Sequence, residues 1–107
     1  MKMLEGKIAL ITGASRGIGK SIAQLFVKEG ATVYAVSRNK EDILAWCKEK
    51  YSTIIPISLD ITDEKAVKKC IMDIRRESSQ LDILVNNAGV EYNELIGMIS
   101  KDHMEAM

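Results

Sequence analysis

The sequence has few of the residues that mark disulfide-rich, zinc-binding or membrane proteins. Its 107 residues include one proline, two cysteines and one histidine, and 5% are aromatic. Cys47 and Cys70 have no metal-type spacing, so we expect free thiols in a cytoplasmic protein and no metal site. No apolar run approaches the length of a membrane span. The first apolar stretch passes into a glycine-rich turn, not a small-residue cleavage site, which argues against a signal peptide.

The chain also has no excess of charge of either sign. Fifteen basic and fifteen acidic residues give a formal net charge of zero, whereas nucleic-acid binding requires a basic surplus on one face. The hydrophobic content of 47% and the charged content of 28% are typical of a globular protein. We therefore expect one small domain, residues 1–107, with neither nucleic acid nor membrane as a partner.

What is present is an alternation of short apolar runs and helical patterns. The runs are rich in Val, Ile and Leu, as strands covered on both faces should be. Between the runs, apolar residues recur at helical spacing and predict one apolar stripe on each helix. Successive βα units predict an α/β fold with a parallel sheet and helices on both faces, a Rossmann-type doubly wound sheet truncated to strands in the order 3-2-1-4. The predicted strands are Ile8–Thr12, Thr32–Val36, Thr53–Ser58 and Leu81–Asn86. The stripes are Ile18, Ile22, Leu25 and Phe26; Ile43, Leu44 and Cys47, with Tyr51 as an optional fourth member; and Val67, Cys70, Ile71 and Ile74.

Single residues predict where these elements end. Gly30 is expected just after the first helix, where a left-handed residue commonly ends it. Asn39, Thr62 and Ser100 are expected to cap the second, third and a fourth helix, because their short polar side chains accept free helical N–H groups. Pro56 falls inside the third strand run, which predicts an edge strand or a strand end.

The segment IALITGASRGIG, residues 8–19, carries the strongest functional signal. A strand run passes into a turn with Gly13, Gly17 and Gly19, and a helical pattern follows directly. The first N–H groups of a helix lack intrahelical partners and lie at the positive end of its dipole, so they favour an anion. Glycine allows both the tight turn and the approach of a pyrophosphate. The turn predicts a nucleotide site, and the alternative is a tight turn that holds no ligand.

The end of the second strand run predicts which nucleotide binds. An acidic residue after this strand binds a free ribose 2′-hydroxyl, whereas a nearby arginine favours a 2′-phosphate. Here Ser37 stands in the acidic position and Arg38 follows, with Arg16 expected close by. Two guanidinium groups can form charge-assisted bonds to a phosphate. We therefore expect NADP(H) in preference to NAD(H); the alternative is two exposed arginines on loops.

Two further strand ends carry polar residues. Asp60 follows the third strand run, where its carboxylate can accept from an adenine amino group or cap the next helix. Asn86 to Gly89 read Asn-Asn-Ala-Gly after the fourth run. Small residues there let the backbone pass close to a ligand, while the amides can tie neighbouring strands together.

Together, TGxxxGxG, the strand-terminal aspartate and NNAG resemble the short-chain dehydrogenase/reductase family in its NADP(H)-preferring form. The likeness extends over the whole chain and is greatest to bacterial 3-oxoacyl-acyl-carrier-protein reductases and related carbonyl reductases. It implies a Rossmann-type sheet and reversible hydride transfer between NADP(H) and a small carbonyl or alcohol substrate, in a protein expected to form homo-oligomers. The resemblance implies that the phosphates are held by the turn residues Gly13, Ser15, Arg16 and Ile18, with Gly17 and Gly19. It implies that the 2′-phosphate is recognised by Ser37 and Arg38. It also implies that the adenine is framed by Asp60 and Ile61, and that the ribose side is lined by Asn87, Ala88 and Gly89.

The family's catalytic residues have no counterpart in this chain. They are a serine, the tyrosine and lysine of a YxxxK motif, and an asparagine, which the resemblance places later in the family's chain. Tyr34, Tyr51 and Tyr92 are followed four residues on by Arg38, Ile55 and Ile96, so none begins that motif. We therefore expect the N-terminal, cofactor-binding portion of a reductase, inactive alone. Two alternatives stay open, a nucleotide-binding module without catalysis and an interaction fragment.

Overall fold

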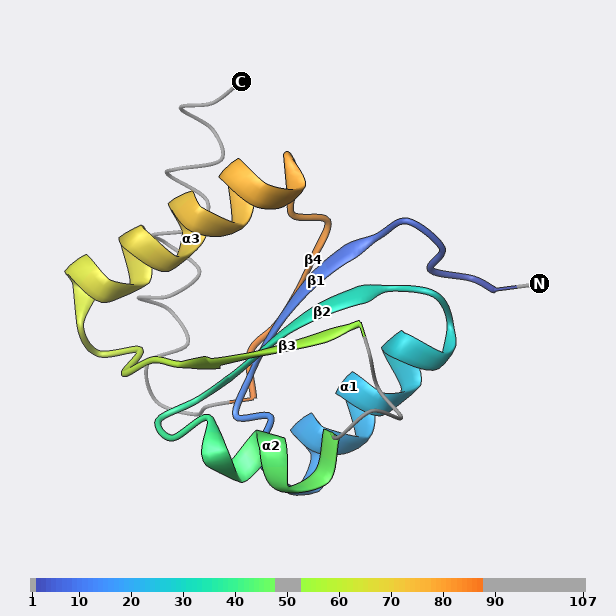
Figure 1. Cartoon of the computed structure of the whole chain (residues 1–107), viewed down its shortest axis with the longest axis horizontal. Helices are drawn as coiled ribbons and strands as arrows, with labels where there is room; N and C mark the ends of the chain where they lie inside the picture. Colours follow the sequence, from blue (N-terminus) through green and yellow to red (C-terminus); the bar gives the residue numbers. More distant parts are fainter. Residues whose placement is uncertain (1, 48–52, 88–107) are drawn as a thin grey trace.

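The computed structural model describes residues 2–47 and 53–87 and contains a parallel sheet between two layers of helices. In Figure 1, α1 and α2 lie on one side of the sheet and α3 lies on the other. Within the described ranges, no helix is long and apolar enough to cross a bilayer. The elements in chain order are β1 (Ile8–Thr12), α1 (Gly17–Lys28), β2 (Thr32–Ser37), α2 (Glu41–Cys47), β3 (Ile54–Ser58), α3 (Glu64–Ser78) and β4 (Ile83–Val85).

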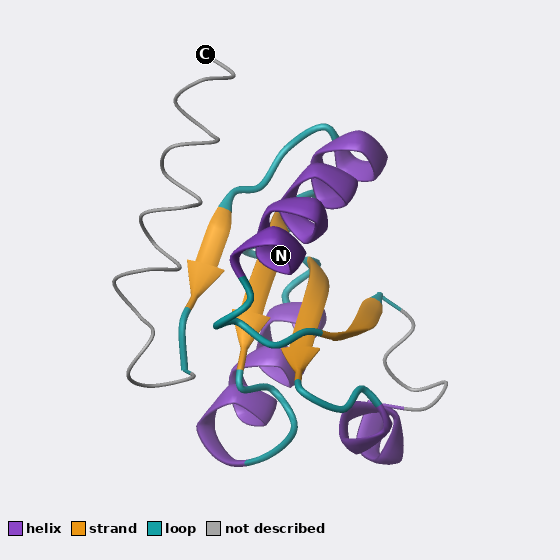
Figure 2. Cartoon of the chain, turned by 90° about the vertical axis from the view of Figure 1, so that its left-hand side faces the viewer, coloured by secondary structure: helices purple, strands orange, loops and turns teal. Residues whose placement is uncertain are grey.

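The strand order is β3-β2-β1-β4, and every neighbouring pair is parallel. This confirms the predicted doubly wound α/β fold. Helices cover both faces (Figure 2), so the sheet has an apolar core on each side. One core packs around Ile11 and Val33 beneath α1 and α2, and the other packs around Leu10 and Val36 beneath α3. Burial of successive strand residues on opposite faces explains why these runs are continuously apolar.

Pro56 lies in an edge strand, as predicted. The N–H of Val33 donates to the Thr53 carbonyl, and the N–H of Leu59 donates to the Ser37 carbonyl. In a parallel ladder alternate residues face the same neighbour, so the odd-numbered residues of this segment pair with β2. Pro56 therefore falls on the outer side, where its missing N–H removes no ladder hydrogen bond.

The predicted apolar stripe of α1 is wrong at two positions. Ile18 and Leu25 are 70% and 55% exposed, whereas Gly19 and Ala23 are buried. Small residues let the helix approach the sheet closely, so the contact face centres on them and turns Ile18 and Leu25 outward. In α2 the predicted stripe is wrong at Leu44, which is 41% exposed, whereas the stripe of α3 is buried at every predicted position.

Helix α1 ends at the position that Gly30 predicts. Gly30 has φ +100°, a conformation that glycine adopts without steric cost. Its N–H donates to the Val27 carbonyl, and the N–H of Ala31 donates to the Phe26 carbonyl. These paired bonds form a Schellman motif, which satisfies the last carbonyls of the helix.

The N-cap of α3 is Asp63 and not Thr62, which corrects the prediction. The Asp63 carboxylate accepts from the N–H of Ala66 at 3.2 Å. The hydroxyl and N–H of Thr62 both donate instead to Oδ1 of Asp60, so this threonine belongs to the preceding turn. For α2 the Asn39 side chain accepts from the N–H of Glu41 at 3.0 Å, as a cap should. Ser100 lies outside the described residues.

This correction predicts unequal effects of two neighbouring substitutions. Asp63→Ala should lower the free energy of unfolding by about 1 kcal/mol, because it removes an N-cap acceptor and a negative charge at the start of α3. Thr62→Ala is the matched control and should have a smaller effect. Urea denaturation of both variants measures the difference, and a larger loss for Thr62→Ala would place the cap one residue earlier.

Candidate nucleotide-binding site

The three glycines of the β1–α1 turn serve two different purposes. Gly13 and Gly17 have φ of +62° and +61°, where glycine is favoured. A Cβ on Gly13 would lie 2.9 Å from the Asn87 carbonyl oxygen, and one on Gly19 would overlap the Gly13 carbonyl oxygen. A Cβ on Gly17 would meet no atom within 4 Å. Gly13 and Gly19 therefore permit close backbone packing, while Gly17 leaves open space at the helix start.

The N-terminus of α1 has the properties of an anion site. Arg16 is its N-cap residue, in an extended conformation, and its side chain makes no capping hydrogen bond. The first turn contains no acidic residue. Neither the N-cap side chain nor an acidic residue of the first turn therefore competes for the first N–H groups and the positive end of the dipole.

Hydrogen bonds fix this turn to the end of β4. The hydroxyl of Thr12, which is 1% exposed, donates to Oδ1 of Asn86 at 2.9 Å and accepts from the N–H of Asn87 at 3.0 Å. Nδ2 of Asn87 donates to the Gly13 carbonyl at 3.3 Å. The paired asparagines therefore tie neighbouring strand ends together, as one of their two predicted roles requires. Ala88 and Gly89 lie outside the described residues.

A pocket of about 310 Å³ opens at the carboxyl ends of β2 and β3. Apolar and polar side chains both face it, which suits a base attached to a sugar phosphate. The topology brings together four of the residues predicted to bind cofactor: Gly13, Ser37, Arg38 and Ile61. The full lining is Gly13, Val36, Ser37, Arg38, Leu59, Ile61 and Thr62.

Asp60 is exposed beside this pocket, and one of its carboxylate oxygens already accepts two hydrogen bonds. Its Oδ1 accepts from the Thr62 hydroxyl at 2.6 Å and from the Thr62 N–H at 2.9 Å. These two bonds, and to a lesser degree the positive charge of Arg38, hold the pKa of the Asp60 carboxyl below its usual value. Asp60 is therefore a carboxylate near Arg38, and its contact with adenine stays a prediction.

Arg16 lines a different hollow from Arg38. This second space, of about 490 Å³, lies between the start of α1 and α2 and is lined by Ser15, Arg16, Asp42 and Ala45. The sequence predicts both arginines near one phosphate; they line two different hollows here, and their joint contact with a phosphate stays a prediction. Asp42 carried no sequence signal for this position.

The fold and its glycine turn define a Rossmann-type α/β unit, and comparison with known proteins specifies the family. The family model for short chain dehydrogenases matches residues 7–107. The chain belongs to the short-chain dehydrogenase/reductase family of oxidoreductases.

Individual relatives agree with this assignment. A 3-oxoacyl-[acyl-carrier-protein] reductase from Thermotoga maritima is 36% identical over 107 residues, covering 97% of this chain and 44% of the relative. A sorbitol dehydrogenase from Cereibacter sphaeroides is 40% identical over 87 residues, covering 81% of this chain and 34% of the relative. A crystal structure assigned to the short-chain dehydrogenase/reductases, from Burkholderia xenovorans, matches with a TM-score of 0.77 and 35% identity, over 84% of this chain and 37% of that one. The chain thus spans less than half the length of these relatives.

Proposed function

We propose that the chain is the cofactor-binding part of an NADP(H)-dependent oxidoreductase that interconverts a carbonyl and an alcohol. The observation that carries the cofactor choice is Arg38, which lines a 310 Å³ pocket beside Ser37, where NAD-binding folds place an acid. The relatives support the reaction class, because one is named a 3-oxoacyl reductase and another a sorbitol dehydrogenase.

The described residues fit the adenosine and phosphate parts of such a cofactor. The uncapped start of α1, with open space at Gly17, would hold the pyrophosphate, and Ser15 and Arg16 adjoin it. Arg38 would bind the 2′-phosphate, and Ile61 would pack on the adenine. NADPH supplies the hydride when bound, while this chain orients the nucleotide at the sheet edge. We assign no catalytic role to any residue of this chain and expect binding without turnover.

Competition between two nucleotide fragments tests this proposal directly. NADPH fluorescence should increase on binding, and adenosine 2′,5′-bisphosphate should displace it roughly 10–100-fold more effectively than 5′-AMP, because hydrogen bonds to charged groups contribute about 1.5–3 kcal/mol. Circular dichroism of the same sample establishes that the chain is folded. A folded chain that binds neither NADPH nor NADH would contradict cofactor binding, and equal displacement by both fragments would contradict the NADP(H) preference.

A further inference from the structure

The turn that carries Arg38 is attached to the end of β3 at two points. Before Arg38, the carbonyl of Ser37 accepts from the N–H of Leu59 at 2.9 Å. After it, the N–H of Lys40 donates to Oγ of Ser58 at 2.8 Å. The short span that includes Arg38 therefore lies between two hydrogen bonds to consecutive residues of the neighbouring strand segment.

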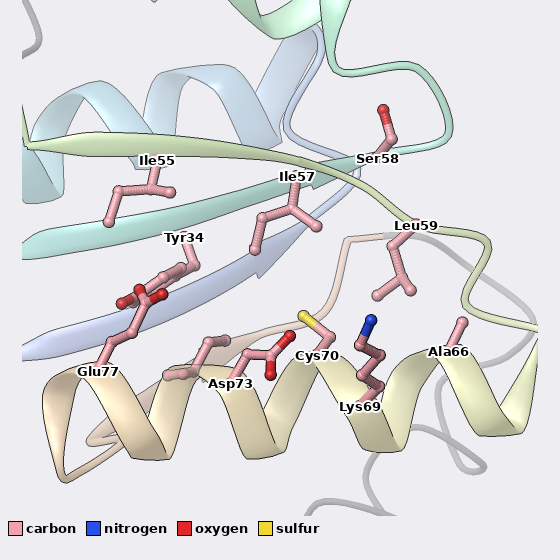
Figure 3. Close-up of a pocket in the computed structure, with 11 residues that line it drawn as sticks. Tyr34, Ile55, Ile57, Ser58, Leu59, Ala66, Lys69, Cys70, Asp73 and Glu77 are labelled. Atoms are coloured by element: carbon pink, nitrogen blue, oxygen red, sulfur yellow. The ribbon is translucent and has the colours of Figure 1, made fainter.

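Ser58 faces this turn because side chains alternate along an extended segment. In Figure 3 the side chains of Ile55, Ile57 and Leu59 point toward α3, whereas Ser58 points to the opposite side, where the chain passes from β2 into α2. Successive residues of a strand alternate in this way. Ser58 is also the register partner of Ser37, the last residue of β2. A short side chain with an acceptor oxygen at this position therefore reaches an N–H group at the start of α2.

The bond from Lys40 to Ser58 is not needed to begin α2. The side chain of Asn39 already accepts from the N–H of Glu41 at 3.0 Å, so the helix keeps a capped first turn when the Ser58 hydroxyl is removed. The Ser58 bond instead joins residues that are 18 apart in the sequence. It fixes where the start of α2 lies relative to β3, and with it the backbone of Arg38.

The position of this turn matters because an arginine side chain is long and flexible. Arg38 is exposed and lines the nucleotide pocket directly after Ser37. Ordering a rotamer-rich side chain opposes binding, and a backbone that also had to be ordered would add to this cost. A turn attached at both ends removes the backbone part of the cost before a phosphate binds.

We propose that Ser58 is a positioning residue for Arg38, whose hydroxyl holds residues 37–40 so that the guanidinium group contacts a 2′-phosphate. The inference rests on the proposed NADP(H) preference. It adds to the nucleotide site a residue outside the lining of the pocket, which acts through a backbone bond and touches no part of the cofactor.

The experiment measures the NADPH to NADH affinity ratio by fluorescence titration. Ser58→Ala should lower this ratio roughly three- to tenfold, because a hydrogen bond between neutral groups makes a modest contribution. Ser58→Thr keeps the acceptor oxygen and should retain the wild-type ratio. An unchanged ratio in Ser58→Ala, or an equal loss in Ser58→Thr, would overturn the proposal.

Thr53→Val is the matched control for a merely structural effect. The Thr53 hydroxyl donates to the Ala31 carbonyl at 3.0 Å, so it ties β3 to the residue before β2 at the opposite end of the strand pair. Thr53→Val should lower stability in urea as much as Ser58→Ala does, yet leave the nucleotide ratio unchanged. An equal fall of the ratio in both variants would overturn the positioning role.

A second background shows whether Ser58 acts through Arg38. In Arg38→Ala, the further substitution Ser58→Ala should leave the nucleotide ratio as it is, because the group to be positioned is gone. A reduction of the same size in both backgrounds would mean that Ser58 affects binding by another route and would overturn the proposal.

The pKa of the Asp60 carboxyl tests the placement of Arg38 without nucleotide. The positive charge of Arg38 helps to lower that pKa, so Ser58→Ala should raise it in an NMR titration, and should not raise it further in Arg38→Ala. If the wild-type chain binds NADPH no better than NADH, the proposed cofactor preference fails. A raised Asp60 pKa would then still support placement of Arg38 by Ser58, and an unchanged one would overturn it.

Discussion

Gly19→Ala should lower the free energy of unfolding by about 2 kcal/mol, although alanine is the better helix former. In an open helix the substitution would gain roughly 1 kcal/mol. Here the added methyl would overlap the Gly13 carbonyl oxygen and lie 2.8 Å from its carbon and 3.0 Å from Nδ2 of Asn87. Overpacking costs roughly 1–3 kcal/mol and occasionally more, and two of these neighbours are backbone atoms that hydrogen bonds hold in place. Steric overlap should therefore outweigh propensity, and urea denaturation measures the balance.

Alanine substitutions at two other glycines distinguish the cost of steric overlap from the cost of backbone strain. Gly6 and Gly17 have φ of +78° and +61°, and a Cβ on either would meet no atom within 4 Å. Each alanine variant should lose about 1–2 kcal/mol through the left-handed backbone alone. Only Gly17→Ala should also weaken NADPH binding, because its methyl would enter the space proposed for the pyrophosphate. Wild-type stability in Gly19→Ala would contradict the packing of this turn.

The periodicity of apolar residues predicted the fold more accurately than it predicted which side of each helix is buried. The sheet order follows from alternating strand and helix runs, because short crossovers allow few arrangements. The outward positions of Ile18 and Leu25 did not follow, since the contact face of α1 is set by how closely Gly19 and Ala23 approach the sheet. β4 is also shorter than its apolar run: Leu81 and Asn86 flank the ladder that β4 forms with β1.

The candidate site was predictable where it depends on topology. One pocket is lined by Gly13 together with Ser37, Arg38 and Ile61, because the carboxyl ends of parallel strands lie at the same edge of a sheet. That Arg16 and Arg38 line different hollows did not follow from their spacing in the sequence.

Arg38→Ala should reduce NADPH affinity by roughly 10–100-fold and leave NADH affinity nearly unchanged. The guanidinium group lines the pocket at the end of β2, and a charge-assisted bond to the 2′-phosphate contributes about 1.5–3 kcal/mol. NADH has a hydroxyl in place of that phosphate and does not need the positive charge. Fluorescence titration with both nucleotides gives the ratio, which should also depend less on salt in the variant.

A measurement without nucleotide tests whether Arg38 lies near Asp60. The charge of Arg38 contributes to the low pKa of the Asp60 carboxyl, so Arg38→Ala should raise that pKa toward its usual value in an NMR titration. The bonds from Thr62 remain, so the rise should be partial. Arg76→Ala is the matched control, because this exposed arginine pairs with Asp73 on α3 and should alter neither quantity. A raised Asp60 pKa with an unchanged NADPH to NADH ratio would keep the geometry and reject Arg38 as the 2′-phosphate ligand.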